Sequence, residues 1–351
     1  MFVFRILGPN YLQFRRGLNT KLLQHVRPLS NSSPFYKGNA TVRNCKAKIS
    51  GKTPRRAVLY VPGNDERKIE KIATLKVDCV VLDCEDGVAN NRKEDARNTI
   101  AKCIPNLLKT SKSEICARVN SVSSGLYQED LETIFKNKFM PQAVMLPKVE
   151  KWQEIETFFD SINPILKPRQ HSVVKLVIFI ETALGLINLK EIIESTIANS
   201  CTTNLLFEGI VFGSDDFCAS IGVERTKNSD ELHYARQKII ANAKAYDLQA
   251  IDMVHIDYKD HEGLETQSIE GASMGFTGKQ VIHPGQIEIV QKCFSPSVDR
   301  IKWAQELIQA FNEHQKLGQG AFTFHGRMID MPLLRQAESV VDMSLKLENN
   351  N

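Results

Sequence analysis

The stretch VKLVIFIE at residues 174–181 decides the fold. Its apolar residues are large or β-branched, form a run too short for an ordinary helix and follow no helical period, so they predict a strand buried on both faces. The carboxylate of Glu181 comes directly after this run, where it would be unfavourable without a cation or a hydrogen-bond donor beside it. The stretch therefore predicts a core strand that ends in a functional group.

Seven further apolar runs follow the same pattern. They are AVLYV (57–61), CVVLD (79–83), ICARV (115–119), AVML (143–146), EGIVF (208–212), AIDMV (250–254) and QVIH (280–283). The stretches between them are compatible with helices, among them DERKIEKIATLK (65–76), QEDLETIFKNKF (128–139) and SDELHYARQKIIANAKAY (229–246). Eight strands alternating with helices over about 230 residues predict an α/β protein with a (β/α)8 TIM barrel. A doubly wound open sheet is the alternative, but the Gly-rich first turn that often marks it is absent from the sequence.

The barrel accounts for the middle of the chain. We expect a transit peptide and linker at 1–54, the catalytic barrel at 55–295, and C-terminal helices with a lid segment at 296–351. In the last part, IKWAQELIQAFNEHQKLGQG (301–320) predicts a helix with a Gly stop. A tail through Asp330 and a last short helix follow it.

Charge is divided unevenly along the chain. The 351 residues carry a net charge of +4, yet residues 1–64 hold twelve Lys and Arg and no acid, which leaves 33 basic and 41 acidic residues for the rest. The acidic body offers no argument for nucleic-acid binding. The basic start, rich in Arg, Leu, Phe and Ser, is typical of a mitochondrial transit peptide. A disordered basic arm that touches RNA or a membrane surface is the alternative.

Two further features bear on the compartment. An uninterrupted apolar run of about 18 residues is absent from the sequence, which argues against a membrane span. The eight cysteines form no CxxC pair and show no zinc-finger spacing, so they indicate neither zinc nor a disulfide framework. This pattern fits the reducing mitochondrial matrix.

Polar residues follow the predicted strands, at the end where a barrel carries its active site. In strand order they are Asn64; Asp83, Glu85 and Asp86; Arg118 and Asn120; Lys148; Glu181; Asp215 and Asp216; His255 and Asp257; and His283. Glu181 and Asp216 come from adjacent strands and could share one hard cation, and two carboxylates with positions left for water and substrate suit Mg²⁺. The alternative for Glu181 is a salt bridge to Arg118 or Lys148. Arg118, inside an apolar strand, suits a buried partner or an anion binder.

Eight motifs, in order, carry a family resemblance. They are LYVPGNDERKIEK, VLDCEDGV, ARVNS, MLPKVE, FIETALGL, VFGSDDF, GKQVIHPGQI and GAFTFHGRMIDMP. Together they resemble the citrate lyase beta-subunit-like branch of the HpcH/HpaI aldolase superfamily, from about residue 56 to about residue 335. The resemblance implies a Mg²⁺-dependent barrel, usually a homotrimer, that makes or breaks a carbon–carbon bond between a CoA-thioester enolate and a 2-oxo acid.

The resemblance also implies roles for single residues. Glu181 and Asp216 match the metal ligands, and Arg118 matches the arginine that contacts the acyl group and its oxyanion. Glu85 and Asp86 match an acidic pair of the family motif, which we expect to position Arg118 or water. Asp215 receives no ligand role.

Three positions match the CoA site and the lid. Tyr60 and Arg67 match CoA-contacting positions after the first strand. Asp330 matches the acid of a C-terminal segment that closes over the site, often that of a neighbouring subunit, and is the candidate general acid or base. His255 and His283 are expected to order loops, because the Pro after His283 indicates a tight turn.

The implied reaction is the cleavage of citramalyl-CoA into acetyl-CoA and pyruvate, with possible malate or methylmalate synthase side activity. The alternatives are malyl-CoA lyase or thioesterase activity, malate synthesis, a CoA-independent 2-oxo-acid aldolase, and an inactive ligand-binding scaffold. We expect the mitochondrial matrix as the location, and neither nucleic acid nor membrane as a partner.

Overall fold

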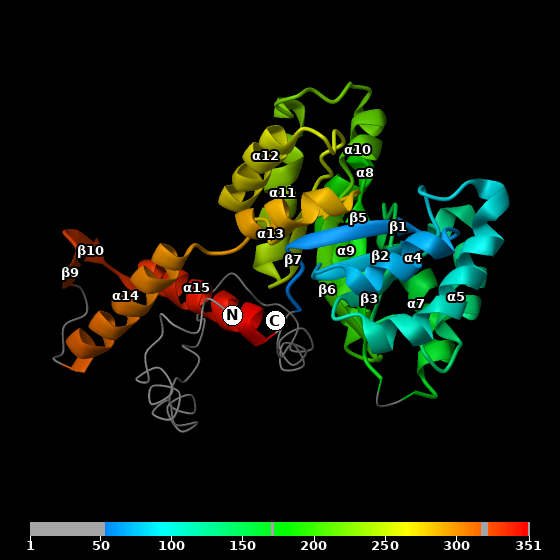
Figure 1. The fold of residues 1–351 in the computed structure, drawn as a ribbon, viewed down its shortest axis with the longest axis horizontal. Coiled ribbons are helices and arrows are strands. Elements are labelled where there is room, and N and C mark those ends of the chain that lie inside the picture. Colours follow the sequence, from blue (N-terminus) through cyan, green and yellow to red (C-terminus); the bar gives the residue numbers. More distant parts are fainter. Residues whose placement is uncertain (1–52, 170–171, 317–321, 350–351) are drawn as a thin grey trace. The chain divides into compact units, whose positions relative to one another are not determined.

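The computed structural model describes residues 53–169, 172–316 and 322–349, and the predicted transit peptide lies outside them. Eight parallel strands form a closed barrel in sequence order (Figure 1). They are β1 (Ala57–Pro62), β2 (Cys79–Asp83), β3 (Glu114–Arg118), β4 (Ala143–Leu146), β5 (Val174–Ile180), β6 (Leu205–Phe212), β7 (Gln249–Asp252) and β8 (Gly278–Val281). Because β1 pairs with β8, the predicted barrel is confirmed and the open sheet is excluded.

Helices connect successive strands. The α-helices are α4 (Glu66–Lys71), α5 (Lys93–Thr110), α6 (Tyr127–Asp130), α7 (Trp152–Leu166), α8 (Ala183–Ile187), α9 (Leu189–Ser200), α10 (Ser214–Ile221), α11 (His233–Ala245), α12 (His261–Met274) and α13 (Ile287–Cys293). Short 3-10 helices lie at Ile72–Thr74, Asn90–Arg92, Val122–Ser124, Asp230–Leu232 and Pro284–Gln286, and a π-helix at Leu131–Phe135. None of the helices in the described ranges is long and apolar enough to cross a membrane.

Strand alternation divides the core into two layers. Val58, Val81 and Cys116 belong to a buried cluster inside the barrel, whereas their neighbours along the strands pack outward against the helices. Because side chains alternate along a strand, Arg118 projects to the same face as Cys116, into the barrel. Tyr60 packs against the interior cluster, two residues after Val58. The strands thus aim both side chains at the interior, near the carboxyl-terminal mouth.

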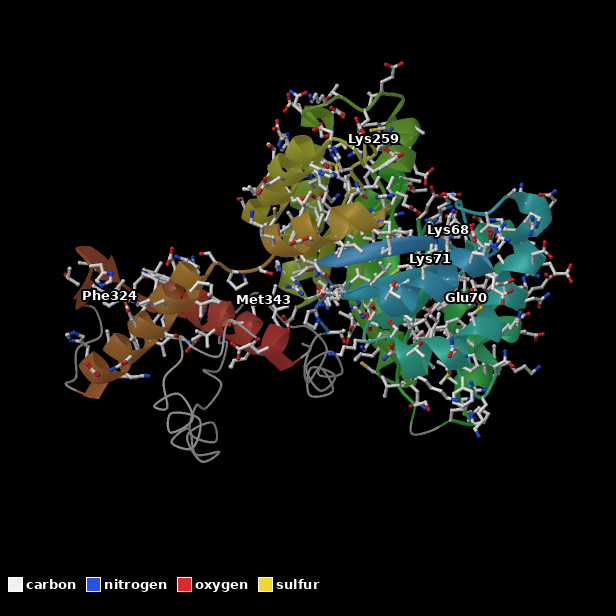
Figure 2. The ribbon with its side chains drawn as sticks, viewed as in Figure 1. Lys68, Glu70, Lys71, Lys259, Phe324 and Met343 are labelled. Carbon is white, nitrogen blue, oxygen red and sulfur yellow. The ribbon has the colours of Figure 1, made fainter. Side chains whose placement is uncertain are left out.

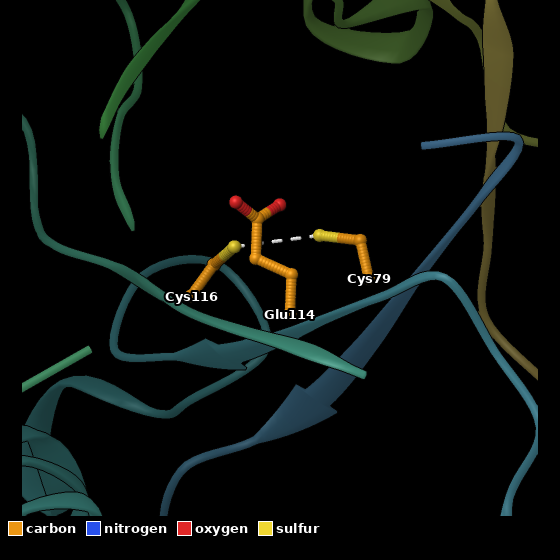
Figure 3. A group of neighbouring side chains, drawn as sticks. All are labelled: Cys79, Glu114 and Cys116. Atoms are coloured by element: carbon orange, nitrogen blue, oxygen red, sulfur yellow. Dashed lines mark hydrogen bonds between the residues drawn. The ribbon is translucent and has the colours of Figure 1, made fainter. Parts of the chain in front are cut away.

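Charged side chains close the amino-terminal end of the barrel. Arg55 is 2% exposed and donates to Glu114 at 2.6 and 2.9 Å and to Glu208 at 2.7 Å. The Sγ atoms of Cys79 and Cys116 lie 3.4 Å apart beside Glu114 (Figure 3). Arg55 neutralises this carboxylate, and Lys175 does so at 2.7 Å. Glu114 is thereby compensated by cations of the chain itself, which gives the cluster a structural role.

The carboxyl-terminal elements differ from the prediction. Helix α14 (Val298–Lys316) is followed by the antiparallel pair β9 (Phe322–Phe324) and β10 (Arg327–Ile329), and then by α15 (Met331–Asn349). The prediction of a short last helix is wrong, because α15 has 19 residues and packs on α14 through a separate apolar cluster. The hairpin was not predicted, since strands of three residues are too short to show a period.

Candidate active site

Arg118 is anchored at the barrel mouth by two carboxylates. Its Nε and Nη2 atoms donate to the two oxygens of Asp83, both at 2.7 Å, and its Nη1 lies 3.1 Å from Glu85 Oε2. Burial disfavours the guanidinium charge, but Asp83 and Glu85 outweigh it and raise the pKa of Arg118. A guanidinium has five N–H donors, so these three contacts leave two for a ligand.

Asp83 also shapes the loop after β2. Its carboxylate accepts hydrogen bonds from the backbone N–H groups of Glu85 at 2.8 Å and Gly87 at 2.9 Å. A Cβ atom at position 87 would lie 2.5 Å from Asp83 Oδ2, so glycine is needed for this close approach. The carboxylate that holds Arg118 therefore also fixes the acidic loop beside it.

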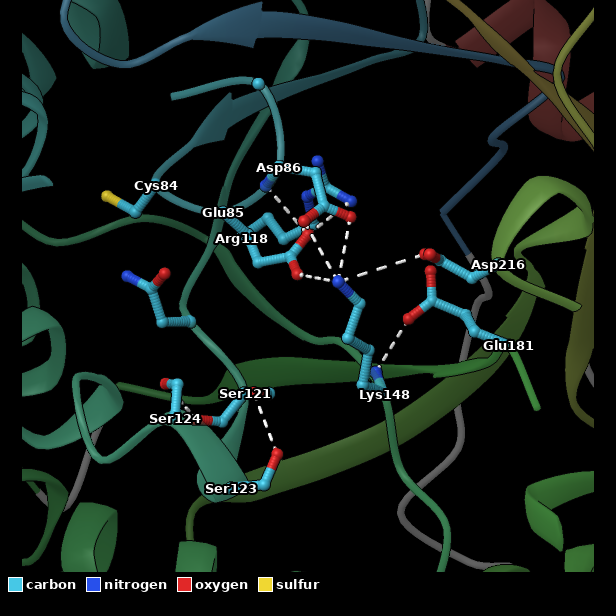
Figure 4. A network of polar contacts seen from close by, with 12 residues as sticks. Cys84, Glu85, Asp86, Arg118, Ser121, Ser123, Ser124, Lys148, Glu181 and Asp216 are labelled. Carbon is cyan, nitrogen blue, oxygen red and sulfur yellow. Dashed lines mark hydrogen bonds and ion pairs between the residues drawn. The ribbon is translucent and has the colours of Figure 1, made fainter. Parts of the chain in front are cut away.

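Lys148 follows β4 and reaches several carboxylates (Figure 4). Its φ of 53° is left-handed, a conformation that is uncommon for a residue with a side chain. The backbone N–H donates to Glu181 Oε2 at 2.7 Å. The ammonium lies 2.7 Å from Glu85 Oε1, 2.9 Å from Asp86 Oδ1 and 3.9 Å from Asp216 Oδ2. One residue thus contacts both the acidic loop and the two predicted metal ligands.

Glu181 is the carboxylate most affected by its surroundings. It is 3% exposed, and burial raises its pKa to about 8, against the attraction of Arg118 and with added repulsion from Glu85 and Asp216. Burial likewise raises the pKa of Asp216, which lies in the first turn of α10 and not at the end of β6 as predicted. A Cβ atom at Gly213 would lie 2.4 Å from Glu181 Oε1, so this glycine leaves room for the carboxylate.

The charges at the mouth do not balance. The carboxylates are Asp83, Glu85, Asp86, Glu181 and Asp216, and the cations in contact with them are Arg118 and Lys148. Glu181 and Asp216 have the fewest close cation contacts of the five, and their pKa values are raised first by burial and then by repulsion from neighbouring carboxylates. Oxygen donors with uncompensated charge suit a hard divalent cation. The residues present therefore fit a metal held by this pair.

The structure separates the two predicted CoA-contacting residues. The Tyr60 ring lies 5.2 Å from the guanidinium carbon of Arg118, and its buried hydroxyl has no hydrogen-bond partner in the described part of the chain. Arg67 is exposed on α4, beside Lys68, and lines a pocket of about 670 Å³ that Asn64 and Arg92 also line. Lys68 projects from the same helix (Figure 2). Tyr60 thus belongs to the barrel interior and Arg67 to the adjoining pocket.

Asp330 is not joined to these residues. It is exposed, and its Oδ1 accepts a hydrogen bond from the backbone N–H of Leu333 at 3.2 Å, at the start of α15. Within the described ranges, no hydrogen bond or ion pair connects Asp330 to the barrel mouth. In this structure the carboxylate caps its own helix.

Several contacts differ from those expected at the mouth. Of the acidic pair, Glu85 does contact Arg118, whereas Asp86 pairs with the Lys148 ammonium. The expected alternative for Glu181, a salt bridge to Arg118 or Lys148, is replaced by the backbone N–H of Lys148. Sequence reasoning missed the left-handed lysine and the bond from Asp83 to Arg118. The signal in the sequence for the bond between Asp83 and Arg118 was that each residue lies at or next to the end of a predicted strand and that the two strands are consecutive. The structure pairs Asp83 with Arg118 in the register of β2 and β3.

Other polar residues at the mouth have local partners. Asp215 pairs with Arg225 at 3.0 Å. His283 accepts from the backbone N–H of Gly285 at 3.1 Å and stacks on Tyr258, which orders its loop as expected. The Nε2 atom of His255 lies 3.9 Å from the carboxylate of the loop residue Asp260.

The fold and the mouth together define a class of barrel enzyme in which carboxylates that could hold a divalent cation share the mouth with a buried arginine. The family can also be stated: the chain belongs to the HpcH/HpaI aldolase/citrate lyase family, whose sequence model matches residues 56–284. The mouth residues Asp83, Arg118, Glu181 and Asp216 all lie within the matched range.

Relatives and solved structures agree with this membership. The chain is 55% identical over 296 residues to "Citramalyl-CoA lyase, mitochondrial" of Homo sapiens, covering 84% of this chain and 87% of that protein. It is 30% identical to "Citrate lyase subunit beta" of Leuconostoc mesenteroides subsp. cremoris, covering 85% and 94%. A crystal structure of CitE from Mycobacterium tuberculosis with magnesium, acetoacetate and coenzyme A matches with a TM-score of 0.65 and 28% identity, covering 83% of this chain and 98% of that one.

Proposed function

We propose that this protein is a lyase that cleaves citramalyl-CoA into acetyl-CoA and pyruvate. The observation that carries the proposal is the buried Arg118, held by Asp83 at the same mouth as the acidic pair Glu181 and Asp216. It is supported by 55% identity to the human relative named for this activity. The magnesium, acetoacetate and coenzyme A in the CitE complex are ligands of the same chemical classes.

The reaction transfers one proton and breaks one carbon–carbon bond. The tertiary hydroxyl of the substrate loses its proton and becomes the ketone of pyruvate, while the electrons of the broken bond pass to the thioester as an enolate. Protonation of the enolate carbon then yields acetyl-CoA. Glu181 and Asp216 would hold Mg²⁺, which polarises the hydroxyl and carboxylate oxygens of the 2-oxo-acid half when bound.

Arg118 suits the enolate oxygen. Its position is set by Asp83 and Glu85 before any ligand arrives, and its two remaining N–H donors can stabilise negative charge that develops on the thioester. Asp330 is the proposed acid that protonates the enolate carbon, delivered by the C-terminal segment acting as a lid. A lid would also exclude water from the enolate.

The pocket beside α4 is proposed to receive the CoA. Arg67, Lys68 and Arg92 line it together with the acidic residues Asp65, Glu66 and Glu70. Of the three cations, Lys68 pairs with Asp65 and Arg92 with Asp95, and Arg67 is the one proposed to meet a phosphate of the nucleotide. Tyr60 is proposed to contact the acyl end of the thioester, next to Arg118. We further propose that the protein is a homotrimer of the mitochondrial matrix and that residues 1–54 contain its transit peptide and linker.

The test is an assay of the purified protein with citramalyl-CoA and with malyl-CoA, with and without Mg²⁺. Metal-dependent release of pyruvate, well above release of glyoxylate from malyl-CoA, is the expected result. Activity confined to malyl-CoA would instead favour a function like that of "(3S)-malyl-CoA thioesterase" of Cereibacter sphaeroides, which is 30% identical. The Asp330→Asn variant should lose turnover and still bind a CoA thioester; normal turnover would remove Asp330 from the mechanism.

A further inference from the structure

Lys148 occupies a position that the proposed reaction leaves without a role. Its ammonium contacts Glu85 and both oxygens of Asp86, at 2.7, 2.9 and 3.0 Å. Asp216 Oδ2 lies farther away, at 3.9 Å, and Glu181 receives only the backbone N–H. The side chain thus pairs closely with two carboxylates of the mouth, whereas its contact with Asp216 is longer and Glu181 is bound through the backbone alone (Figure 4).

The backbone of Lys148 supports this division. Its φ of 53° is unfavourable for a residue with a Cβ, and such conformations persist where surrounding contacts maintain them. Here the conformation directs the N–H group to Glu181 Oε2 while the side chain reaches the loop after β2. One contact orients a proposed metal ligand, and the other restrains two carboxylates that could compete for the metal.

We propose that Lys148 is a positioning residue that sets the metal selectivity of the site by keeping Glu85 and Asp86 out of the coordination shell. The inference rests on the proposed metal pair Glu181 and Asp216. Ca²⁺ accepts six to eight oxygen ligands, whereas Mg²⁺ is held by one or two carboxylates and retains positions for water and substrate. With Glu85 and Asp86 restrained, two carboxylates remain, which is the number that suits Mg²⁺ and leaves room for the 2-oxo acid.

The test measures binding of the metal alone. MgCl₂ and CaCl₂ are titrated calorimetrically into the metal-free full chain for the wild type, Lys148→Met and Lys148→Arg. Removing the ammonium frees Asp86 and one oxygen of Glu85, whose other oxygen stays paired with Arg118, and a positive charge leaves the mouth. Lys148→Met should therefore bind Ca²⁺ about tenfold more tightly and shift the preference from Mg²⁺ towards Ca²⁺. Lys148→Arg should behave as the wild type, since it keeps the cation. Unchanged or weaker Ca²⁺ binding by Lys148→Met overturns the inference.

Controls separate this inference from the proposed metal site. Lys190→Met removes an exposed lysine of α9 and should change neither affinity. Glu181→Gln should abolish binding of both metals; if it does not, the metal site itself is misplaced. Asp86→Asn tests the inference in a chain that keeps Lys148, so its result does not depend on whether the lysine variants fold. It should change the Mg²⁺ affinity less than threefold, because Asp86 is already paired with the Lys148 ammonium. A loss as large as that of Glu181→Gln would make Asp86 a ligand and overturn the role of Lys148.

Discussion

Replacing Glu181 by Gln should stabilise the metal-free protein at pH 8, although the change is made at a buried residue. The pKa of Glu181 rises from an ordinary 4.5 to about 8, chiefly through burial. Between these two values the unfolded chain has lost a proton that the folded chain still holds, so folding stability falls as the pH rises. The pKa difference sets an upper limit of about 5 kcal/mol for this destabilisation. The amide avoids it and can still accept the Lys148 N–H.

The measurement is urea unfolding in EDTA between pH 5.5 and pH 8.5. We expect Glu181→Gln to exceed the wild type by about 2–4 kcal/mol at pH 8, and the difference to shrink by about 2 kcal/mol at pH 5.5. Saturating Mg²⁺ should stabilise the wild type alone, by about 3 kcal/mol at a hundredfold excess over Kd. Glu156→Gln, at an exposed position of α7, serves as the matched control for the change of a glutamate to glutamine. A variant less stable than the wild type at pH 8 in EDTA would refute the reasoning.

Three further outcomes are expected. Arg118→Met should lower kcat about 100-fold or more, because it removes the enolate donor, while a CoA thioester still binds in equilibrium dialysis; unaltered kcat would exclude the assigned role. Gly213→Ala should weaken Mg²⁺ binding in calorimetry, since its Cβ would lie 2.4 Å from Glu181 Oε1. Unchanged affinity would contradict the role of Gly213 in leaving room for the Glu181 carboxylate. Arg55→Met should reduce the free energy of unfolding by about 3–5 kcal/mol in urea titrations, because it leaves Glu208 buried without its cation; a loss below 1 kcal/mol would be too small for that network.

The strands can be predicted from the local sequence because burial on both faces requires a short run of apolar residues. Six β-branched or bulky apolar residues beside a single lysine leave no continuous polar face, so VKLVIFI reads as a core strand without knowledge of its neighbours. The carboxyl ends of parallel strands meet at one end of a barrel, which is why Glu181 and Arg118 could be assigned to a common mouth. The same reasoning failed for β9 and β10, whose length gives no period to detect.

The partners within the site depend on three-dimensional geometry. Whether Arg118 pairs with Asp83, Glu85 or Glu181 follows from the strand register and from the direction of each side chain, and several carboxylates were equally available in the sequence. The left-handed backbone of Lys148 is likewise invisible in the sequence, because MLPK has no glycine to mark it. Arg55 is the first residue after the predicted linker and precedes the first apolar run, yet it is buried at the far end of the barrel.

The sequence by itself therefore determined the strands, the barrel and the set of residues at its mouth, because these follow from hydrophobic burial and chain order. Only the tertiary structure decided which carboxylates neutralise Arg118 and Lys148 and which remain for a metal. That choice depends on differences of about 1 Å between competing oxygen atoms, such as the 2.7 Å from the Lys148 ammonium to Glu85 and the 3.9 Å to Asp216. Distances of this size are set by packing of the whole barrel and leave no trace in local sequence.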